Sequence, residues 1–288
     1  ESVYRETALP DFEVIVVDNA STDGSAEMLR SEFPQVRLLA LEENVGFAAA
    51  NNRAAEVADG RYLLLLNPDT VVLEHAIDRI VTFAQRKPEH GIYGGATRFP
   101  DGSRNPTSGW NMASWWSLLT TGLGLSSLFR GSKIFDSESL AYWDWQSERE
   151  VDIVTGCFFL IHRDLWEGLG GFDLRFHMYG EDADLCLRAR SLHARPVIVP
   201  TAEIIHYGGA SEAVRAEKMT RLLRAKVQLF RKHWSPLGAA YAVAMLRLWA
   251  WSRKAGLSLA AHGKPSLTEG SEAWRAVWRR RREWSRVA

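Results

Sequence analysis

Short apolar runs that end in polar turns are the feature of this chain that most restricts its fold. The run Phe12–Val17 is rich in β-branched residues, and a polar turn at 18–25 follows it directly. Two similar runs lie at Val36–Leu41 and Arg61–Leu66, and segments with helical character separate the three. Because consecutive parallel strands need a helical crossover between them, this order predicts an α/β domain with a mostly parallel sheet flanked by helices.

Apolar runs and helical character also locate the remaining strands and helices, except within one irregular segment. Residues Arg98–Glu150 are rich in Gly, Ser and Trp and are expected to form a long surface excursion that could close over a site. Further strands are expected at Val151–Ile161 and Arg195–Pro200, and helices up to about Glu32 and over Ala48–Ala58, Leu73–Arg86, Arg163–Leu169 and Glu181–Leu192.

Length and cysteine content restrict the class of protein. A chain of 288 residues can bury one large core and carry an appendage. Cys157 and Cys186 both lie in apolar runs, so we expect buried free thiols in a reducing compartment rather than a disulfide framework. No Gly-x-Gly-x-x-Gly motif follows any strand, which disfavours a nucleotide-dependent dehydrogenase.

Charge divides the chain unequally. Residues 215–288 contain 17 Lys and Arg against 4 Asp and Glu, whereas residues 1–214 contain 18 against 31. We therefore predict two domains: an α/β domain over residues 1–212 and a helical, basic, Trp-rich extension over residues 213–288.

Acidic residues follow two of the expected strands. Asp18 comes directly after the first run, and Asp69 ends the turn Asn67-Pro68-Asp69 after the third. Ligands of open parallel sheets bind beyond the carboxyl ends of the strands, so two acids on strands of one sheet would point into the same crevice. Either acid alone would be explained equally well as a turn or cap residue, but together they favour a ligand site.

Two later motifs add candidate catalytic groups. Glu181, Asp182 and Asp184 open a helix whose next residues are apolar, and a carboxylate held there can take a proton from a hydroxyl nucleophile. A solvated helix start is the alternative. His206 follows an apolar strand and precedes Gly208 and Gly209; such a histidine is often structural, but the glycines favour contact with a metal or phosphate.

Six segments in this order resemble glycosyltransferase family 2, and within it the bacterial rhamnosyltransferase-like branch. The resemblance extends from about Thr7 to Trp234. The segments are Val-Ile-Val-Val-Asp-Asn-Ala-Ser-Thr-Asp-Gly-Ser, Asn-Val-Gly-Phe-Ala-Ala-Ala-Asn-Asn, Leu-Leu-Leu-Asn-Pro-Asp-Thr, Gly-Gly-Phe-Asp, Tyr-Gly-Glu-Asp-Ala-Asp-Leu-Cys and His-Tyr-Gly-Gly.

The resemblance implies a GT-A fold and an inverting, metal-dependent sugar transfer. It implies that Asp182 is the catalytic base and that Glu181 beside it shapes the acceptor pocket. Asp69 would bind Mg²⁺ or Mn²⁺ at the diphosphate, with His206 as a further metal or diphosphate ligand. The implied nucleotide- and donor-binding residues are Asp18, Asn19, Asn51, Asn67 and Gly156.

The chain departs from the family pattern in two places. The family's opening strand, of the form Val-Ser-Val-Val-Ile-Val-Thr-Tyr-Asn, is absent, so we expect a chain shortened at its N-terminus and an Asp18 without its usual neighbour. The first position of the family's Asp-x-Asp signature is Asn67 rather than an acid. One fewer carboxylate on the metal is tolerable if His206 contributes.

The basic extension suggests a surface partner. Leu237–Trp251 is too short to span a bilayer, and six of the twelve tryptophans follow residue 214, interleaved with arginine. This pattern suits an anionic membrane surface, although a solvated face packed on the catalytic domain also explains it; nucleic acid is not an expected partner. The corresponding location is the cytoplasm, with peripheral attachment to the inner face of the plasma membrane.

The leading hypothesis is therefore transfer of a sugar, with L-rhamnose from dTDP-rhamnose as a candidate, to a cell-surface glycan or lipid-linked acceptor. A UDP-sugar donor is the alternative within the class. A non-catalytic nucleotide-sugar-binding or membrane scaffold protein is the alternative outside it.

Overall fold

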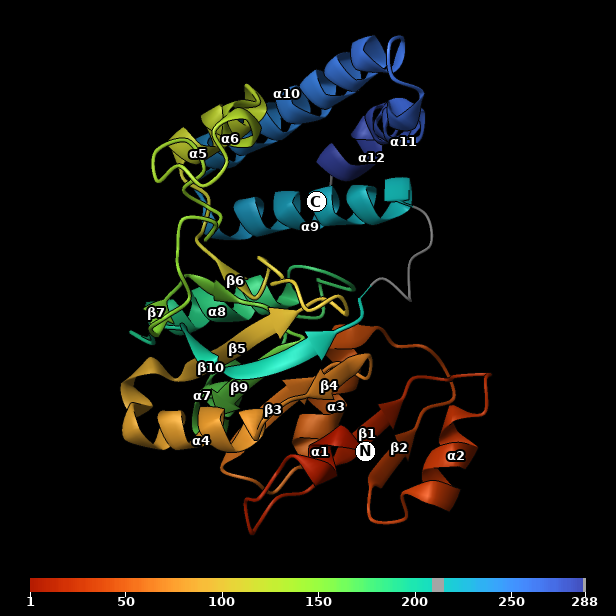
Figure 1. Ribbon diagram of the computed structural model, residues 1–288, viewed down its shortest axis with the longest axis vertical. Helices are drawn as coiled ribbons and strands as arrows, with labels where there is room; N and C mark the ends of the chain where they lie inside the picture. Colours follow the sequence, from red (N-terminus) through yellow and green to blue (C-terminus); the bar gives the residue numbers. More distant parts are fainter. Residues whose placement is uncertain (209–214, 287–288) are drawn as a thin grey trace. The chain divides into compact units, whose positions relative to one another are not determined.

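Two compact units make up the computed structural model, which describes residues 1–208 and 215–286. The first unit consists of Glu1–Ser108 and Gln146–Tyr207, and the second of Gly109–Trp145 and Gly208–Ala288 (Figure 1). Most of the predicted surface excursion thus belongs with the C-terminal helices. The predicted division between residues 212 and 213 lies outside the described residues.

The first unit is an α/β structure, as predicted. Its main sheet has the strand order β3-β9-β5-β10-β4, and β7 pairs with β10. Its strands are β1 (Ile15–Asp18), β2 (Arg37–Ala40), β3 (Tyr62–Leu66), β4 (Thr70–Val72), β5 (Ile92–Arg98), β7 (Arg149–Glu150), β8 (Ile153–Val154), β9 (Phe158–His162) and β10 (Val197–His206). Its helices are α1 (Ser2–Arg5), α2 (Ser25–Glu32), α3 (Phe47–Val57), α4 (Ala76–Arg86), α7 (Arg163–Leu169) and α8 (Glu181–Ser191).

The main sheet is mixed rather than mostly parallel, which corrects the prediction. Among the described strands of this sheet, β5 and β10 are the one adjacent pair that is parallel, and β9 is antiparallel to both of its neighbours, β3 and β5. The strand β9 follows the long excursion instead of a helical crossover, and only the crossover obliges a strand to return in the parallel direction.

The strands β1 and β2 form a separate parallel pair, so the expectation that Asp18 and Asp69 follow strands of one sheet is wrong. Two contacts tie the pair to the end of α3: an Arg37 guanidinium nitrogen lies 2.5 Å from the Val57 carbonyl, and the Asp59 amide donates to Glu13. The position of Asp18 is therefore set by loops and by α3 rather than by a ladder shared with β3.

Two strands differ from their predicted extents because of glycine. The run Val151–Ile161 divides into β8 and β9 at a turn that contains Gly156. The strand β5 has no counterpart in the prediction, because Gly94 and Gly95 weaken its apolar pattern. A side chain at Gly95 would place Cβ only 2.2 Å from the Phe158 ring, so glycine here leaves room for that ring on the neighbouring strand β9.

The core of the first unit lies between α4 and the main sheet. The apolar face of α4 presents Ile77, Ile80 and Phe83 to strand residues that include Phe158 and Ile204. Both cysteines are buried and free, as predicted.

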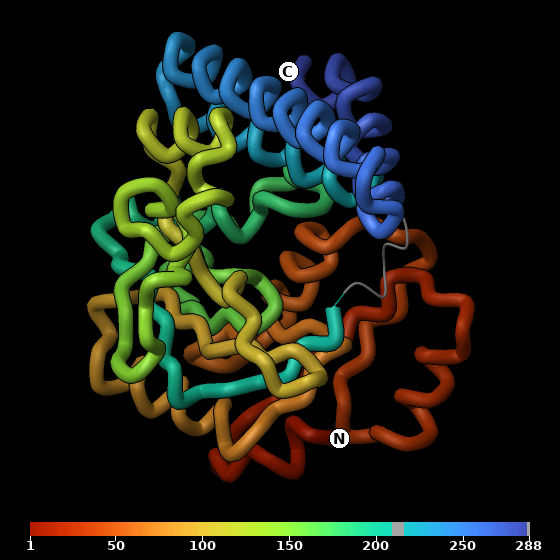
Figure 2. Tube along the Cα trace, turned by 45° about the horizontal axis from the view of Figure 1, so that its top comes forward, coloured from red at the N-terminus to blue at the C-terminus, as the bar shows by residue number. Residues whose placement is uncertain are grey.

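The second unit is helical. Its main elements are β6 (Gly109–Trp110), α5 (Trp115–Gly122), α6 (Leu125–Leu128), α9 (Arg215–His233), α10 (Pro236–Ala261), α11 (Thr268–Arg279) and α12 (Arg281–Ser285). The long helix α10 packs against α5, α9 and α11 (Figures 1 and 2). Within the described chain, no helix combines the length and the apolar character that crossing a bilayer requires.

Tryptophans of the basic extension build the core of this unit. Trp274 and Trp284 are buried with Phe230 and Leu246, and the Trp284 indole donates to the Val277 carbonyl. Trp278 is partly buried and packs under the Arg281 guanidinium. Only Trp251 of the six is largely exposed. The interleaved Trp and Arg residues therefore reflect helix packing more than an aromatic surface.

Candidate active site

The turn after β3 begins the site. The Thr70 hydroxyl donates to the Asn67 carbonyl at 2.7 Å, and the Asn67 amide donates to the Cys157 carbonyl at 3.1 Å. Pro68 restricts the backbone between these two anchors. The Asp69 side chain is therefore presented from a rigid turn at the end of a buried strand.

Antiparallel pairing of β4 with β10 brings His206 to this turn. The register places His206 opposite Thr70, and the Tyr207 amide donates to the Asp69 carbonyl at 2.9 Å. The His206 Nε2 atom lies 3.2 Å from Asp69 Oδ1 and 3.4 Å from Nδ2 of the Asn67 side chain. The side chains that the sequence named as metal ligands, together with Asn67, thus meet at one point.

The donor atoms of Asp69 and His206 suit a divalent metal. A carboxylate oxygen and an imidazole nitrogen suit Mn²⁺, and Mg²⁺ is commonly held by one or two carboxylates with substrate phosphates and water. No set of three or more His, Cys, Asp or Glu side chains that could hold a metal occurs in the part of the chain that the structure describes. The two groups therefore fit a metal that takes its other ligands from a bound diphosphate.

Two acids in the first turn of α8 form the second part of the site. Asp182 Oδ2 accepts the Gly156 amide at 2.9 Å, and Oδ1 accepts the Ala183 amide at 2.7 Å. Burial raises the pKa of Asp182, and these two backbone amides oppose that rise. Hydrogen bonds of this kind stabilise the ionised carboxylate.

Glu181 has the opposite environment. Only 6% of the residue is exposed, and its Oε2 atom has no hydrogen-bond partner among the described residues. Burial, followed by the charge of Asp182, raises the pKa of Glu181 to about 8. A proton shared by two adjacent acids resides on the one with fewer donors. Glu181 is thus the protonated member near neutral pH, and Asp182 carries the charge.

The raised pKa of Glu181 predicts that the free energy of unfolding depends on pH. The pKa of Glu181 in the folded protein is about 8, above the ordinary value of 4.5. The folded state therefore binds the proton more tightly, and stability falls as pH rises from about 4.5 to 8, by up to ~1.4 kcal/mol per pH unit. Glu181→Gln should lessen this decline, of which the raised pKa of Asp182 keeps a part, and be more stable than wild type at pH 9 in urea unfolding with EDTA. Glu27→Gln, an exposed carboxylate on α2, should decline as wild type does; an equal decline in Glu181→Gln would contradict the prediction.

The turn containing Gly156 and Cys157 connects the two parts. Gly156 donates to Asp182, whereas the Cys157 carbonyl accepts the Asn67 amide. Burial raises the pKa of the Cys157 thiol to about 12, and the charges of both Asp182 and Asp69 contribute to the rise. The acid pair and the Asp69–His206 pair therefore lie on either side of one short turn.

The predicted nucleotide-binding residues lie around α3. Asp18 is buried at the end of β1. The Asn19 side chain accepts the Val45 amide and donates to Asn44, which holds the loop before α3. Asn51 donates within the helix to the Phe47 carbonyl. The Phe47 ring would lie 3.6 Å from a Cβ atom at Gly156, so this region adjoins the acid pair.

A polar hollow lies close to Asp18. Its volume is about 640 Å³, and it is lined by residues at the end of β2 and by Arg53 of α3. Asp18 is the register partner of Ala40, which lies in that lining. Two acids, Glu42 and Glu43, line this hollow together with Arg53. Arg53 carries no signal in the sequence, because one arginine on an alanine-rich helix forms no pattern.

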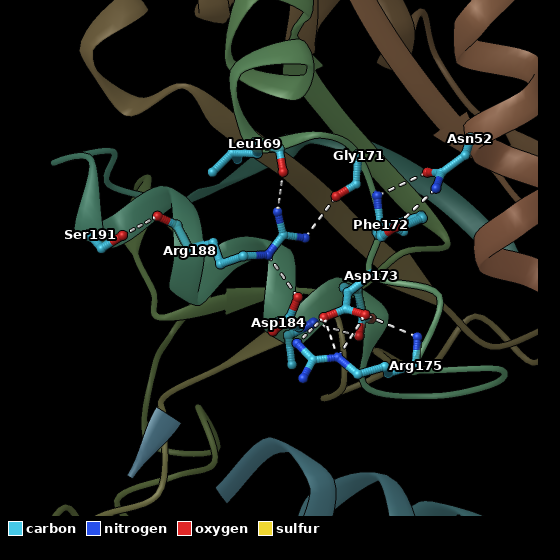
Figure 3. A network of polar contacts seen from close by, with 11 residues as sticks. Asn52, Leu169, Gly171, Phe172, Asp173, Arg175, Asp184, Arg188 and Ser191 are labelled. Carbon is cyan, nitrogen blue, oxygen red and sulfur yellow. Dashed lines mark hydrogen bonds and ion pairs between the residues drawn. The ribbon is translucent and has the colours of Figure 1, made fainter. Parts of the chain in front are cut away.

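A network behind α8 was also missed from the sequence (Figure 3). The Arg188 guanidinium contacts Asp184 at 2.8 Å and the carbonyls of Leu169 and Gly171 at 2.7 Å each. Asn52 makes two hydrogen bonds with the Phe172 backbone. Asp184 is fully buried and belongs to this framework rather than to the acid pair. The Asp–Arg spacing of four residues was the available signal.

Comparison with known proteins identifies the family. The model of the family "Glycosyl transferase family 2" matches residues 1–167. Among curated relatives, the N-acetylglucosaminyl-diphospho-decaprenol L-rhamnosyltransferase of Mycobacterium tuberculosis is 33% identical over 208 residues, covering 67% of this chain and 66% of the relative. The O-antigen biosynthesis protein RfbC of Myxococcus xanthus is 31% identical over 219 residues, covering 75% of this chain but only 16% of RfbC.

A solved structure supports the fold. The mannosyltransferase PcManGT from Pyrobaculum calidifontis, in complex with GDP-Man and Mn²⁺, has a TM-score of 0.59 at 19% identity, covering 99% of this chain and 82% of that one. At this identity the likeness concerns the fold alone, which is the predicted GT-A type. Because the family model matches more than half of the chain, the protein belongs to glycosyl transferase family 2.

Proposed function

We propose that the protein transfers L-rhamnose from dTDP-L-rhamnose to a lipid-linked acceptor, with inversion at the anomeric carbon. The observation that carries this proposal is the unequal hydrogen bonding of Glu181 and Asp182 beside the Asp69–His206 pair. A single charged base close to a diphosphate site is what one inverting displacement requires. The choice of sugar and acceptor is supported by the M. tuberculosis relative.

In the proposed reaction, an acceptor hydroxyl oxygen attacks the anomeric carbon of the sugar. The bond from that carbon to the diphosphate oxygen breaks, and its electron pair leaves with dTDP. The hydroxyl proton passes to the charged carboxylate of Asp182. Glu181, protonated near neutral pH because of its raised pKa, adds no second negative charge beside the base and borders the acceptor.

Asp69 and His206 would hold the Mg²⁺ or Mn²⁺, and Asn67 would hydrogen-bond the diphosphate. A bound divalent cation supplies Lewis-acid stabilisation of the negative charge that develops on the leaving diphosphate. Asp18, Asn19 and Asn51 would bind the nucleoside, either directly or by shaping the loop before α3. Gly156 would leave room for the sugar next to Asp182.

A donor panel tests the proposal. The chain is incubated with Mn²⁺, a polyprenyl-diphosphate-linked N-acetylglucosamine acceptor, and either dTDP-L-rhamnose or a UDP-hexose. We expect acceptor-dependent release of dTDP from the first donor only, and a product whose anomeric configuration is inverted. Release of UDP instead would replace the donor assignment. Nucleotide binding by calorimetry without release from either donor would indicate a binding protein rather than an enzyme.

The metal assignment predicts a selective loss in one variant. In His206→Ala, the affinity for dTDP measured by calorimetry with Mn²⁺ should fall about tenfold or more, because one metal ligand is lost. Binding measured with EDTA should change little. His162→Ala removes a partly buried histidine at the end of β9 and should match wild type in both conditions. An equal loss of dTDP affinity with and without Mn²⁺ would assign His206 to the nucleotide rather than to the metal.

A further inference from the structure

The long helix α10 of the second unit is apolar on two opposite sides. Its inner side, which includes Ala239, Ala242, Leu246 and Ala250, is buried in the core of the unit. Its outer side carries an apolar strip at the spacing of successive helical turns: Leu237, Ala240, Ala244, Leu248, Trp251, Ala255 and Leu259. An amphipathic helix of a water-surrounded domain normally has polar residues on its outer side, so the strip needs another explanation.

The strip is exposed where its large side chains lie. Leu237, Trp251 and Leu259 are 82%, 49% and 76% exposed. Because the inner side of α10 is anchored in the core, the helix axis lies along the surface of the unit, and the strip extends for about 33 Å at 1.5 Å per residue. Figure 2 shows α10 along the outside of the second unit.

The neighbouring helices α5 and α6 add to this surface. Leu248 of the strip approaches Gly122 of α5, and Trp115 stacks on Tyr241 of α10 at 4.5 Å between ring centroids. Large apolar side chains of this neighbouring segment are themselves about half or more exposed: Trp115, Trp116, Leu123, Leu128, Phe129 and Ile134. Contiguous exposed apolar area of this kind marks an interaction surface.

Charge identifies the partner. The two segments that carry this surface, residues 109–135 and α10 itself, contain no Asp or Glu, and their charged residues are all Lys or Arg. The next acids along the chain are already engaged: Asp136 accepts the Gly131 amide, and Glu138 accepts the Ser117 hydroxyl. Arg253 of α10 donates to the Ser127 hydroxyl, and Arg130 lies near enough for its charge to help burial lower the pKa of Arg253. Neither arginine has an acidic partner among the described residues. A second copy of the chain would bring like charges together, whereas an anionic lipid surface would neutralise them.

We propose that the strip of α10, with the exposed residues of α5 and α6, binds an anionic lipid surface. The helix lies in the interface plane with its apolar side chains among the acyl chains. The long side chains of Arg130, Lys133 and Lys254 reach the lipid phosphates. This surface is built from different residues than the candidate active site, so it does not depend on which sugar is transferred. It narrows the sequence-based prediction, which assigned membrane binding to the whole basic extension, to one side of α10 together with α5 and α6.

Vesicle flotation of the full chain tests this surface. We expect wild type to float with vesicles containing 30 mol% phosphatidylglycerol (a test composition of roughly one anionic lipid in three) and about tenfold less with phosphatidylcholine alone. The variant Leu237→Gln/Trp251→Gln/Leu259→Gln should lose flotation about tenfold or more, with an unchanged circular dichroism spectrum because these side chains are exposed. The matched control Met28→Gln/Leu174→Gln/Leu192→Gln changes three exposed apolar residues of the first unit and should float as wild type does.

A second pair of variants tests the role of charge. Arg130→Gln/Lys133→Gln/Lys254→Gln should weaken binding to the anionic vesicles, whereas Arg30→Gln/Arg61→Gln/Arg86→Gln, exposed arginines of the first unit, should not. The proposal is overturned if wild type floats with neither vesicle, or if the apolar triple variant floats as wild type does. It is also overturned if light scattering shows a wild-type dimer that the apolar triple variant abolishes, without flotation, because the strip would then bind a second copy.

Discussion

Replacing Asp182 by asparagine should lower the rate of sugar transfer by about 10²- to 10⁴-fold, the usual contribution of a general base. Asparagine preserves the shape of the side chain and can still accept the Gly156 amide through its oxygen, but it cannot take the acceptor proton. The affinity for dTDP should remain close to wild type, because Asp182 is proposed to act on the acceptor and not on the nucleotide. Single-turnover transfer and calorimetry measure the two quantities separately.

The neighbouring acid provides the sharpest comparison. Glutamine is a good mimic of a protonated glutamate, and Glu181 is protonated near neutral pH because burial and Asp182 raise its pKa. Glu181→Gln should therefore retain transfer within about tenfold of wild type. Asp164→Asn, at the exposed start of α7, should retain all of it. If Glu181→Gln lost more activity than Asp182→Asn, the base would be Glu181 instead.

The contribution of the sequence to this picture is clearest for β3 and α8. The apolar run before Asn67 and the acids before Leu185 predicted both elements, because local apolar pattern and turn residues specify strand ends and helix starts. The chemistry expected at their ends stays a prediction. The residues named from the family resemblance lie in the first unit, and Asp69 and His206 do meet. The family resemblance is confirmed, and the family model matches the part of the chain that holds the first three of the six quoted segments.

The pairing and direction of the strands could not be predicted from local sequence patterns. Nothing in Phe158–His162 itself shows that β9 runs antiparallel between β3 and β5, since a buried strand has the same apolar pattern in either direction.

The Trp-rich helices show a related limit of prediction from sequence. An interleaved Trp and Arg pattern is compatible with a membrane surface and with a helical core, and only the packing of Trp274 and Trp284 decides for the core. For the same reason, the sequence pattern alone did not predict that α10 carries an exposed apolar strip.

Arg188 should have the largest effect on stability of any residue around the site. Its side chain neutralises Asp184, which has no exposed surface, and also binds the Leu169 and Gly171 carbonyls (Figure 3). Arg188→Leu would remove the guanidinium that pairs with the buried carboxylate at 2.8 Å. Removing one partner of a buried pair costs about 3–5 kcal/mol, so urea unfolding of this variant should show a loss of that size.

The same helix offers a matched control for this prediction. Arg190 pairs with Asp152 at 2.9 Å, but its side chain is 43% exposed, and exposed pairs contribute about 0–1 kcal/mol. Arg190→Leu should therefore leave the unfolding free energy within about 1 kcal/mol of wild type. The double variant Asp184→Asn/Arg188→Leu should recover part of the loss, because no buried charge remains, although the two carbonyls stay without their donor. Similar losses in Arg188→Leu and Arg190→Leu would mean that Arg188 is not the anchor of α8. The acid pair would then owe its position to the Gly156 hydrogen bond alone.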